Sequence, residues 1–117
     1  MKLLPWDTKI WQKKVWYSKK ILFDGQDSWY PWSLVQEIKI MPGETAQSHH
    51  HKIQTEIFYF LSNCGYRIVN WKKITPNIWD ILLIEPNDMH IVVNDSKQDY
   101  LYLAFKIDYV SDDSYWK

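Results

Sequence analysis

Short segments rich in β-branched and aromatic residues alternate with turns along this chain, and no convincing helical period appears. The turns are marked by groups such as Asp24-Gly25, Pro42-Gly43 and Thr75-Pro76-Asn77. The strands expected between turns cover residues 15–23, 34–40, 56–61, 66–71, 80–84, 89–93 and 100–107. Short strands at regular spacing are typical of β-sandwiches and barrels, so the sequence predicts an all-β fold.

The size and charge of the chain limit the kinds of protein that it can be. A length of 117 residues with 46% hydrophobic content suits one core, so we expect a single domain. The 14 basic residues balance the 14 acidic ones and are scattered, which argues against a nucleic-acid partner. No apolar run has membrane-spanning length, and the first residues lack the apolar core of a signal peptide. Together with a single cysteine, Cys64, these features predict a cytoplasmic protein without a membrane partner.

The chain has four histidines: the triplet His49, His50 and His51, and the distant His90. One carboxylate, Glu56, follows the triplet by five residues. Alternate side chains of a strand share a face, so His49 and His51 project together and His50 projects the other way. An uninterrupted strand would send Glu56 to the opposite face. We therefore expect a turn or bulge within residues 52–55 that brings Glu56 to the histidines.

This set of side chains can surround one metal ion. Imidazole nitrogen and carboxylate oxygen together suit a divalent transition metal, namely iron, manganese, nickel, copper, cobalt or zinc. The predicted ligands are His49, His51, Glu56 and His90, and His50 is left out. The donor set does not choose among these metals.

The spacing of these residues resembles the two sequence motifs of the cupin family. Gly43, His49, His51 and Glu56 stand at the spacing of the first motif, and His90 and Asn94 at that of the second. Three positions where the family has glycine hold other residues here: Asn63, Trp79 and Asn87. Asparagine tolerates a left-handed turn, so residues 62–65 are expected to form a hairpin turn, whereas Trp79 puts its local turn in doubt.

The resemblance implies a double-stranded β-helix, or jelly-roll barrel, over the whole chain, residues 1–117. Residues 34–107 would be the barrel core with both motifs, residues 1–33 an N-terminal strand or arm, and residues 108–117 a C-terminal tail. Many cupins pair an N-terminal strand with a neighbouring subunit, so a homodimer through residues 9–23 is expected. The tail either covers the mouth of the barrel or is solvated, and solvation is favoured.

Strand alternation predicts the walls of a pocket around the ion. Phe58 and Phe60 share the face of Glu56, and Val92 shares the face of His90. Trp29 and Trp32 are candidates for the pocket mouth, although tryptophans of the first third of the chain more often serve a core or a subunit interface. Arg67 can grip a carboxylate or phosphate, but a lone arginine is more often a surface ion-pair partner.

The resemblance to cupins is compatible with several functions. The leading hypothesis is a mononuclear metal-dependent enzyme that chelates a small polar metabolite at the ion, of the isomerase, epimerase or dioxygenase type. The alternative is a non-catalytic cupin that binds a small ligand such as a sugar or sugar acid. A third reading is a jelly-roll interaction module with a vestigial site. The catalytic residues are not identified, because no general base is visible in the sequence.

Overall fold

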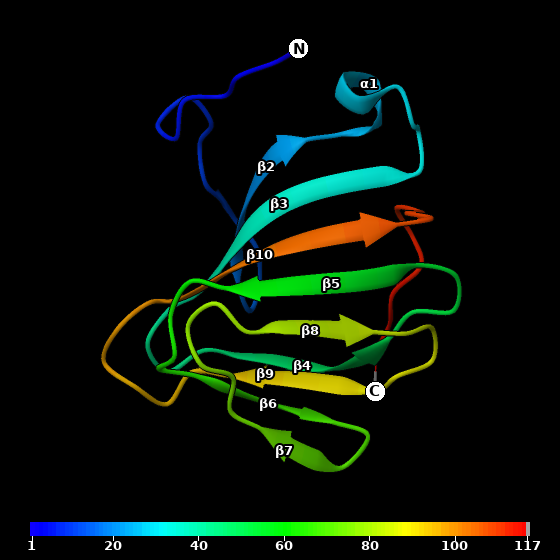
Figure 1. Ribbon diagram of the computed structural model, residues 1–117. Coiled ribbons are helices and arrows are strands. Elements are labelled where there is room, and N and C mark those ends of the chain that lie inside the picture. The colour runs from blue at the N-terminus through cyan, green and yellow to red at the C-terminus, as the bar shows by residue number, and fades with distance from the viewer. Residues whose placement is uncertain (117) are drawn as a thin grey trace.

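Two antiparallel β-sheets face each other in the computed structural model, which describes residues 1–116 (Figure 1). The first sheet has the order β1-β2-β3-β10-β5-β8 and the second β11-β4-β9-β6-β7. The elements are β1 (Gln12–Lys13), β2 (Ser18–Phe23), α1 (Gly25–Ser28), β3 (Ser33–Ile40), β4 (Thr45–His50), β5 (Thr55–Phe60), β6 (Tyr66–Val69), β7 (Lys72–Ile74), β8 (Ile81–Ile84), β9 (His90–Val93), β10 (Tyr100–Ile107) and β11 (Tyr115–Trp116).

The chain crosses repeatedly from one sheet to the other. β3, β5, β8 and β10 lie in the first sheet, and β4, β6 and β9, which fall between them in sequence, lie in the second. Successive crossings of this kind wind the chain into a double-stranded β-helix. The predicted all-β fold and jelly-roll barrel are therefore confirmed.

The core lies between the sheets and changes character along the barrel. β3, β5 and β10 bury alternate residues, as expected for strands with one face inward. Ile40, Phe60 and Tyr100 fill one end of the interior with apolar and aromatic groups. At the other end the inward positions hold polar residues, including Gln36 and Glu56. This polar end is where a site can form.

The segment 66–71, predicted as one strand, is instead two. Asn70 and Trp71 have φ of 48° and 71° and form a two-residue turn between β6 and β7. Two successive left-handed residues match the twist of a tight hairpin, which explains the break. The strands predicted from the sequence did not include four strands of the structure: β1, β4, β7 and β11.

The three family glycine positions behave differently from one another. Residues 62–65 do not form a hairpin turn, because β5 and β6 lie in different sheets, and Asn63 has no positive φ. Trp79 and Asn87, in contrast, each have a φ of 74°. The backbone therefore keeps the left-handed conformation that glycine would favour, even with a tryptophan side chain.

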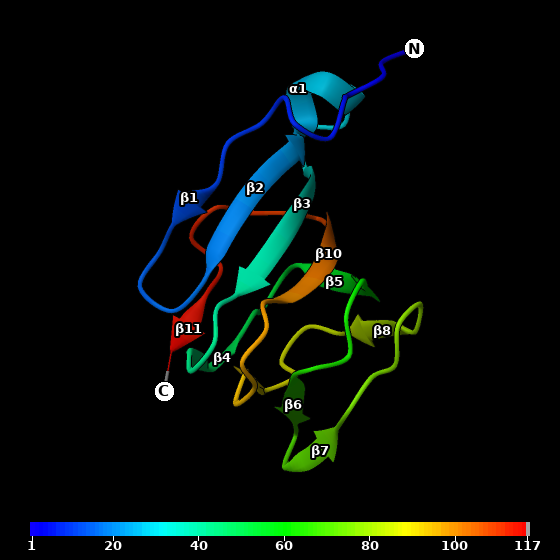
Figure 2. The same ribbon diagram turned by 90° about the vertical axis from the view of Figure 1, so that its left-hand side faces the viewer.

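Segments near both ends of the chain extend the two sheets, with β1 beside β2 and β11 beside β4 (Figure 2). Residues 9–23 contribute β1 and β2, and β2 pairs with β3 of the same chain. The tail is not solvated as expected: β11 pairs with β4, and Asp113 is buried. Lys117, the last residue of the predicted tail, lies outside the described residues. Among the described residues no helix has the length and apolar character needed to span a membrane.

Candidate metal centre

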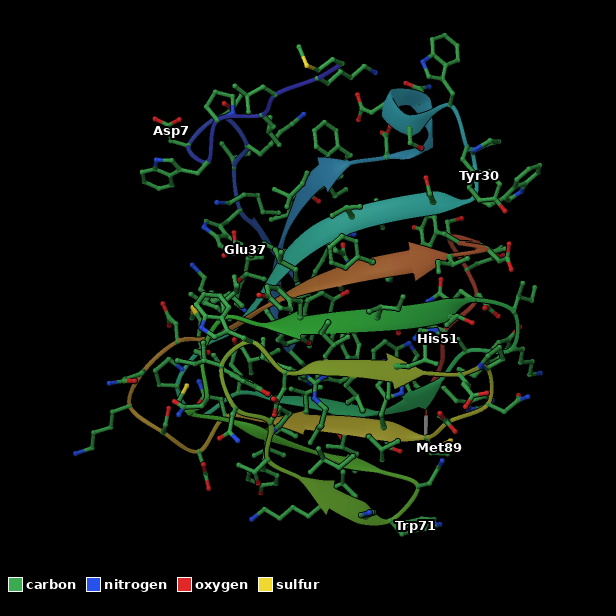
Figure 3. The ribbon with its side chains drawn as sticks, viewed as in Figure 1. Asp7, Tyr30, Glu37, His51, Trp71 and Met89 are labelled. Carbon is green, nitrogen blue, oxygen red and sulfur yellow. The ribbon has the colours of Figure 1, made fainter. Side chains whose placement is uncertain are left out.

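The four predicted ligands meet at the polar end of the barrel, and Figure 3 shows His51 there. His49 lies on β4 directly opposite His90, the first residue of β9. His51 follows the end of β4, and Glu56 lies near the start of β5. β4 ends at His50 and β5 begins at Thr55, so the expected break before Glu56 is present. His50 lies outside the group and stacks against Tyr115.

The potential ligand atoms of this group lie within 4.8 Å of one another. His51 Nε2 is 2.5 Å from Glu56 Oε1, and His90 Nε2 is 3.7 Å from the same oxygen. Donors at the usual distance of about 2.1 Å from an ion lie no more than about 4.2 Å apart, so a small inward shift would let all four reach one ion. His51, Glu56 and His90 are buried, and His49 is partly buried.

Each of the three imidazoles is oriented by a backbone carbonyl. His49 Nδ1 contacts the Gln47 carbonyl at 2.8 Å, His51 Nδ1 the Asp113 carbonyl at 2.8 Å, and His90 Nδ1 the Asp88 carbonyl at 3.1 Å. A carbonyl oxygen only accepts, so each Nδ1 carries the proton and donates it. A neutral imidazole of this tautomer leaves Nε2 with a free lone pair, which is the form that binds a metal.

The charges of these groups also suit an ion. Burial and the neighbouring His90 lower the pKa of His49 to about 3, against the opposing effects of Gln47 and Glu56. Burial likewise lowers the pKa of His90. Burial would raise the pKa of Glu56, but His51, Lys106 and His90 outweigh it and lower this pKa to about 2. Neutral imidazoles at His49 and His90 and an ionised carboxylate are the states that coordination requires.

Two buried atoms that could bind a metal, both hydrogen-bond acceptors, have no hydrogen-bond partner within the described chain. His51 Nε2 and Glu56 Oε1 are close, but neither has a hydrogen bond of acceptable geometry. Such orphaned buried atoms are costly unless another partner lies between them. A divalent cation would satisfy both, so the donor set fits a metal ion.

The loop between His51 and Glu56 is held by a residue that the sequence analysis missed. The Asp113 carboxylate accepts hydrogen bonds from the backbone amides of Lys52, Ile53 and Gln54 at 3.0, 2.9 and 2.9 Å. Asp113 is 2% exposed and about 60 residues from this loop along the chain, so no local pattern marks it. The C-terminal segment thus fixes the loop that connects two of the predicted ligands.

A cavity of about 70 Å³ lies beside the four ligands. Phe58 and Val92 line it, as expected from strand alternation. Its polar wall is formed by groups that the sequence analysis did not select: Tyr17, Gln36, Lys106 and Ser114. Lys106 lies on the same face of β10 as the buried residues Tyr102 and Ala104. Strand alternation could therefore have predicted that Lys106 faces inward.

Phe60 and Arg67 lie behind the cavity and do not line it. The preference for Arg67 as a surface ion-pair partner was wrong, because its side chain is 0% exposed. Its guanidinium packs on the rings of Phe58, Phe60 and Tyr102 at 4.5, 4.8 and 4.6 Å. A flat, weakly hydrated cation can be buried against aromatic faces in this way, whereas an ammonium is harder to desolvate.

The structure does not bring Trp29 and Trp32 to the cavity. Their side chains are 90% and 54% exposed, and neither lines it. Trp116 takes the place expected of them at the mouth, where its ring packs at a tilt against His49, with the ring centroids 4.5 Å apart, and against Trp16, with the centroids 5.0 Å apart. The mouth is therefore built from both ends of the chain.

Comparison with known proteins defines the fold. No family model matches the sequence, and no curated protein does. Solved structures do match: a cupin-2 domain from Rhodospirillum rubrum is 13% identical, with a TM-score of 0.78 over 99% of this chain and 80% of that one. KdgF from Halomonas sp. is 18% identical, with a TM-score of 0.75 over 88% and 89%. A predicted oxalate decarboxylase from Thermotoga maritima is 23% identical, with a TM-score of 0.70 over 78% and 79%.

These likenesses and the crossing topology show that the chain has the cupin fold. Within that fold it carries a group of three histidines and one glutamate that could hold a metal ion beside a small cavity.

Proposed function

We propose that this protein binds one divalent transition metal ion through His49, His51, Glu56 and His90, and acts on a small polar metabolite from the adjoining cavity. The observation that carries the proposal is the common tautomer of the three imidazoles, whose Nδ1–H groups all donate to backbone carbonyls. Three free Nε2 atoms and one carboxylate then converge within a buried space. Iron, manganese, nickel, copper, cobalt and zinc all accept such donors.

The chemistry proposed is isomerisation, epimerisation or dioxygenation. When bound, the ion would polarise a carbonyl or enediol oxygen and, if redox-active, would also bring dioxygen to the substrate. The hydroxyls of Tyr17 and Ser114 and the amide of Gln36 line the cavity and can orient a substrate by hydrogen bonds. The apolar wall of Phe58 and Val92 excludes bulk water from the same space.

The alternative function is binding without catalysis. The family resemblance suggests a sugar or sugar acid for this role, but pockets for drug-sized ligands have about 300 Å³ or more. The cavity of about 70 Å³ favours a ligand smaller than a hexose unless the mouth at Trp116 opens. Binding with no turnover across small hydroxy acids, aldoses and diketones would support this alternative.

A homodimer and a cytoplasmic location remain predictions. The outer faces of β10, β5 and β8 support the homodimer, because they present an apolar surface rather than a polar one. Phe105 lies opposite Ile57, which lies opposite Leu83, and the exposed fractions of Phe105 and Leu83 are 36% and 52%. Contiguous exposed apolar side chains of this kind mark interaction surfaces.

Elemental metal analysis tests the proposed centre. Protein purified without a tag or chelating resin should contain one metal ion per chain, and His51→Ala should contain none. His50→Ala is the matched control, because His50 is adjacent but lies outside the group, and it should keep the ion. Metal content well below one in the unaltered protein, even after each divalent ion is added back, would overturn the proposal.

A further inference from the structure

The cavity beside the metal centre is lined by one lysine, Lys106, and one acidic residue, Glu56. Lys106 lies at an inward position of β10, opposite Glu56 in the strand register, and lines the cavity. No ion pair among residues 1–116 includes its ammonium group. The Lys106 ammonium group lies 5.3 Å from the centroid of the Tyr109 ring. Lys106 therefore faces Glu56 across the register but lies beyond ion-pair distance of it, so its ammonium group has capacity to bind another anion.

A second cation stands behind the cavity wall. The Arg67 guanidinium is wholly buried against Phe58 and Tyr102, which both line the cavity. Its three nitrogens have no hydrogen-bond partner among the described residues. The guanidinium lies 4.5 Å from the Phe58 ring and 4.6 Å from the Tyr102 ring, so one layer of aromatic rings separates its charge from the cavity. Charges in a poorly solvated interior act over such distances more strongly than charges in water.

The acidic groups nearby do not balance these cations. Glu56 is the acidic residue that lines the cavity. Its single negative charge would offset only one of the two positive charges of a bound divalent ion. The Asp113 carboxylate is engaged by three backbone amides of the 52–54 loop. With the ion bound, Lys106 and Arg67 therefore add to a positive centre, and a neutral ligand would leave that charge uncompensated.

From these charges we infer that the ligand is a small carboxylate and that Lys106 selects it. The inference rests on the proposed metal centre and names the substrate class for it. The carboxylate would face Lys106 and the ion. A hydroxyl on the ligand would supply a donor for Gln36 Oε1, which is buried and has no hydrogen-bond partner in the described chain. The cavity of about 70 Å³ limits the compound to a few non-hydrogen atoms.

Glycolate and its neutral analogue glycolamide test this inference, because they share a similar shape and the same hydroxyl group, and glycolamide has a neutral amide in place of the carboxylate. Cobalt-loaded protein would be titrated with each probe, and binding followed by the visible spectrum of cobalt. Glycolate should bind about tenfold or more tightly than glycolamide, as expected for a charge-assisted hydrogen bond. Lys106→Met should weaken glycolate binding by about tenfold and leave glycolamide unchanged. Lys106→Arg should retain the preference for glycolate.

Lys97→Met is the control, because Lys97 is exposed, and it should bind both probes as the unaltered protein does. Equal glycolate affinity in Lys106→Met and the unaltered protein would overturn the inference. An equal loss for both probes would overturn it too, because it would show that Lys106 only shapes the site. Cobalt content is measured before any probe is added. If the protein holds no cobalt, the proposed metal centre is wrong. If the protein holds cobalt but binds both probes equally, only the inference about a carboxylate ligand is wrong.

Discussion

The backbone carbonyl of Asp113 accepts a hydrogen bond from Nδ1 of His51 at 2.8 Å, although 62 residues separate the two along the chain. The Asp113 carboxylate at the same time binds the amides that follow His51. One buried residue of the C-terminal segment therefore orients a predicted metal ligand and holds the loop beside it. Outer groups that orient metal ligands commonly affect metal affinity by about 10 to 100-fold.

Asp113→Ala should weaken both the metal centre and the fold. Removal of the carboxylate leaves three backbone amides without their acceptor, so we expect a loss of about 2–4 kcal/mol in the free energy of unfolding. Metal affinity, measured by competition with a chelator, should fall by at least about tenfold. The exposed neighbour Asp112 provides a control, since Asp112→Ala should change neither quantity. Unchanged metal affinity in Asp113→Ala would contradict a positioning role.

Trp116 should control the rate at which metal leaves the site. Its ring covers His49 and is itself covered by Trp16, so Trp116→Ala should open the mouth. We expect removal of the metal by EDTA to become roughly tenfold faster, because a covering group slows exchange with solvent. Trp71→Ala is the control: Trp71 is 92% exposed at the β6–β7 turn, away from His51 (Figure 3). Equal rates in the two variants would show that Trp116 is not a cover.

Arg67 should be replaceable by a side chain of similar length without charge. Burial of its guanidinium costs solvation energy, which the aromatic rings offset in part. We expect Arg67→Met to change the free energy of unfolding by no more than about 1.5 kcal/mol. Arg67→Ala leaves a cavity and should cost about 3–5 kcal/mol. Urea unfolding measures both, and a loss in Arg67→Met as large as that in Arg67→Ala would show that the charge itself stabilises the core.

Trp79 offers a test of backbone strain. Its φ of 74° is left-handed, and its ring packs on Tyr59 at 5.7 Å. Trp79→Ala loses the ring and keeps the strain, whereas Trp79→Gly loses the ring and relieves the strain. The free energy of unfolding, measured by thermal unfolding, should therefore be about 1 kcal/mol higher for the glycine variant than for the alanine variant. The reverse order would mean that the left-handed conformation is not retained in solution.

The outer face of β10, β5 and β8 should mediate self-association. Leu83→Lys and Phe105→Lys place charges on this apolar surface and should convert a dimer to a monomer in sedimentation velocity. Ile10→Lys, on the exposed N-terminal segment, distinguishes the two routes to a dimer. A monomer in Ile10→Lys alone would favour pairing through residues 9–23. A monomer in the unaltered protein would end the homodimer prediction.

Local patterns were enough to predict the fold class and the ligand group. Alternation along a strand determines which side chains share a face, so Glu56, Phe58 and His90 could be assigned to the interior from sequence. The break after His51 also followed from this rule, because Glu56 would otherwise face outward. Left-handed positions are encoded less directly, as Trp79 shows.

The tertiary structure decided the surroundings of the site. Whether Arg67 is buried depends on rings from β5 and β10, and whether Asp113 is buried depends on a loop about 60 residues earlier. Lys106 could be placed inward by alternation, but its lack of a carboxylate partner follows from how other strands pack. The sequence alone determined which residues of a strand share a face, because that property has the two-residue period of a strand. Contacts between distant segments have no such period, so only the folded chain decided what surrounds the metal centre.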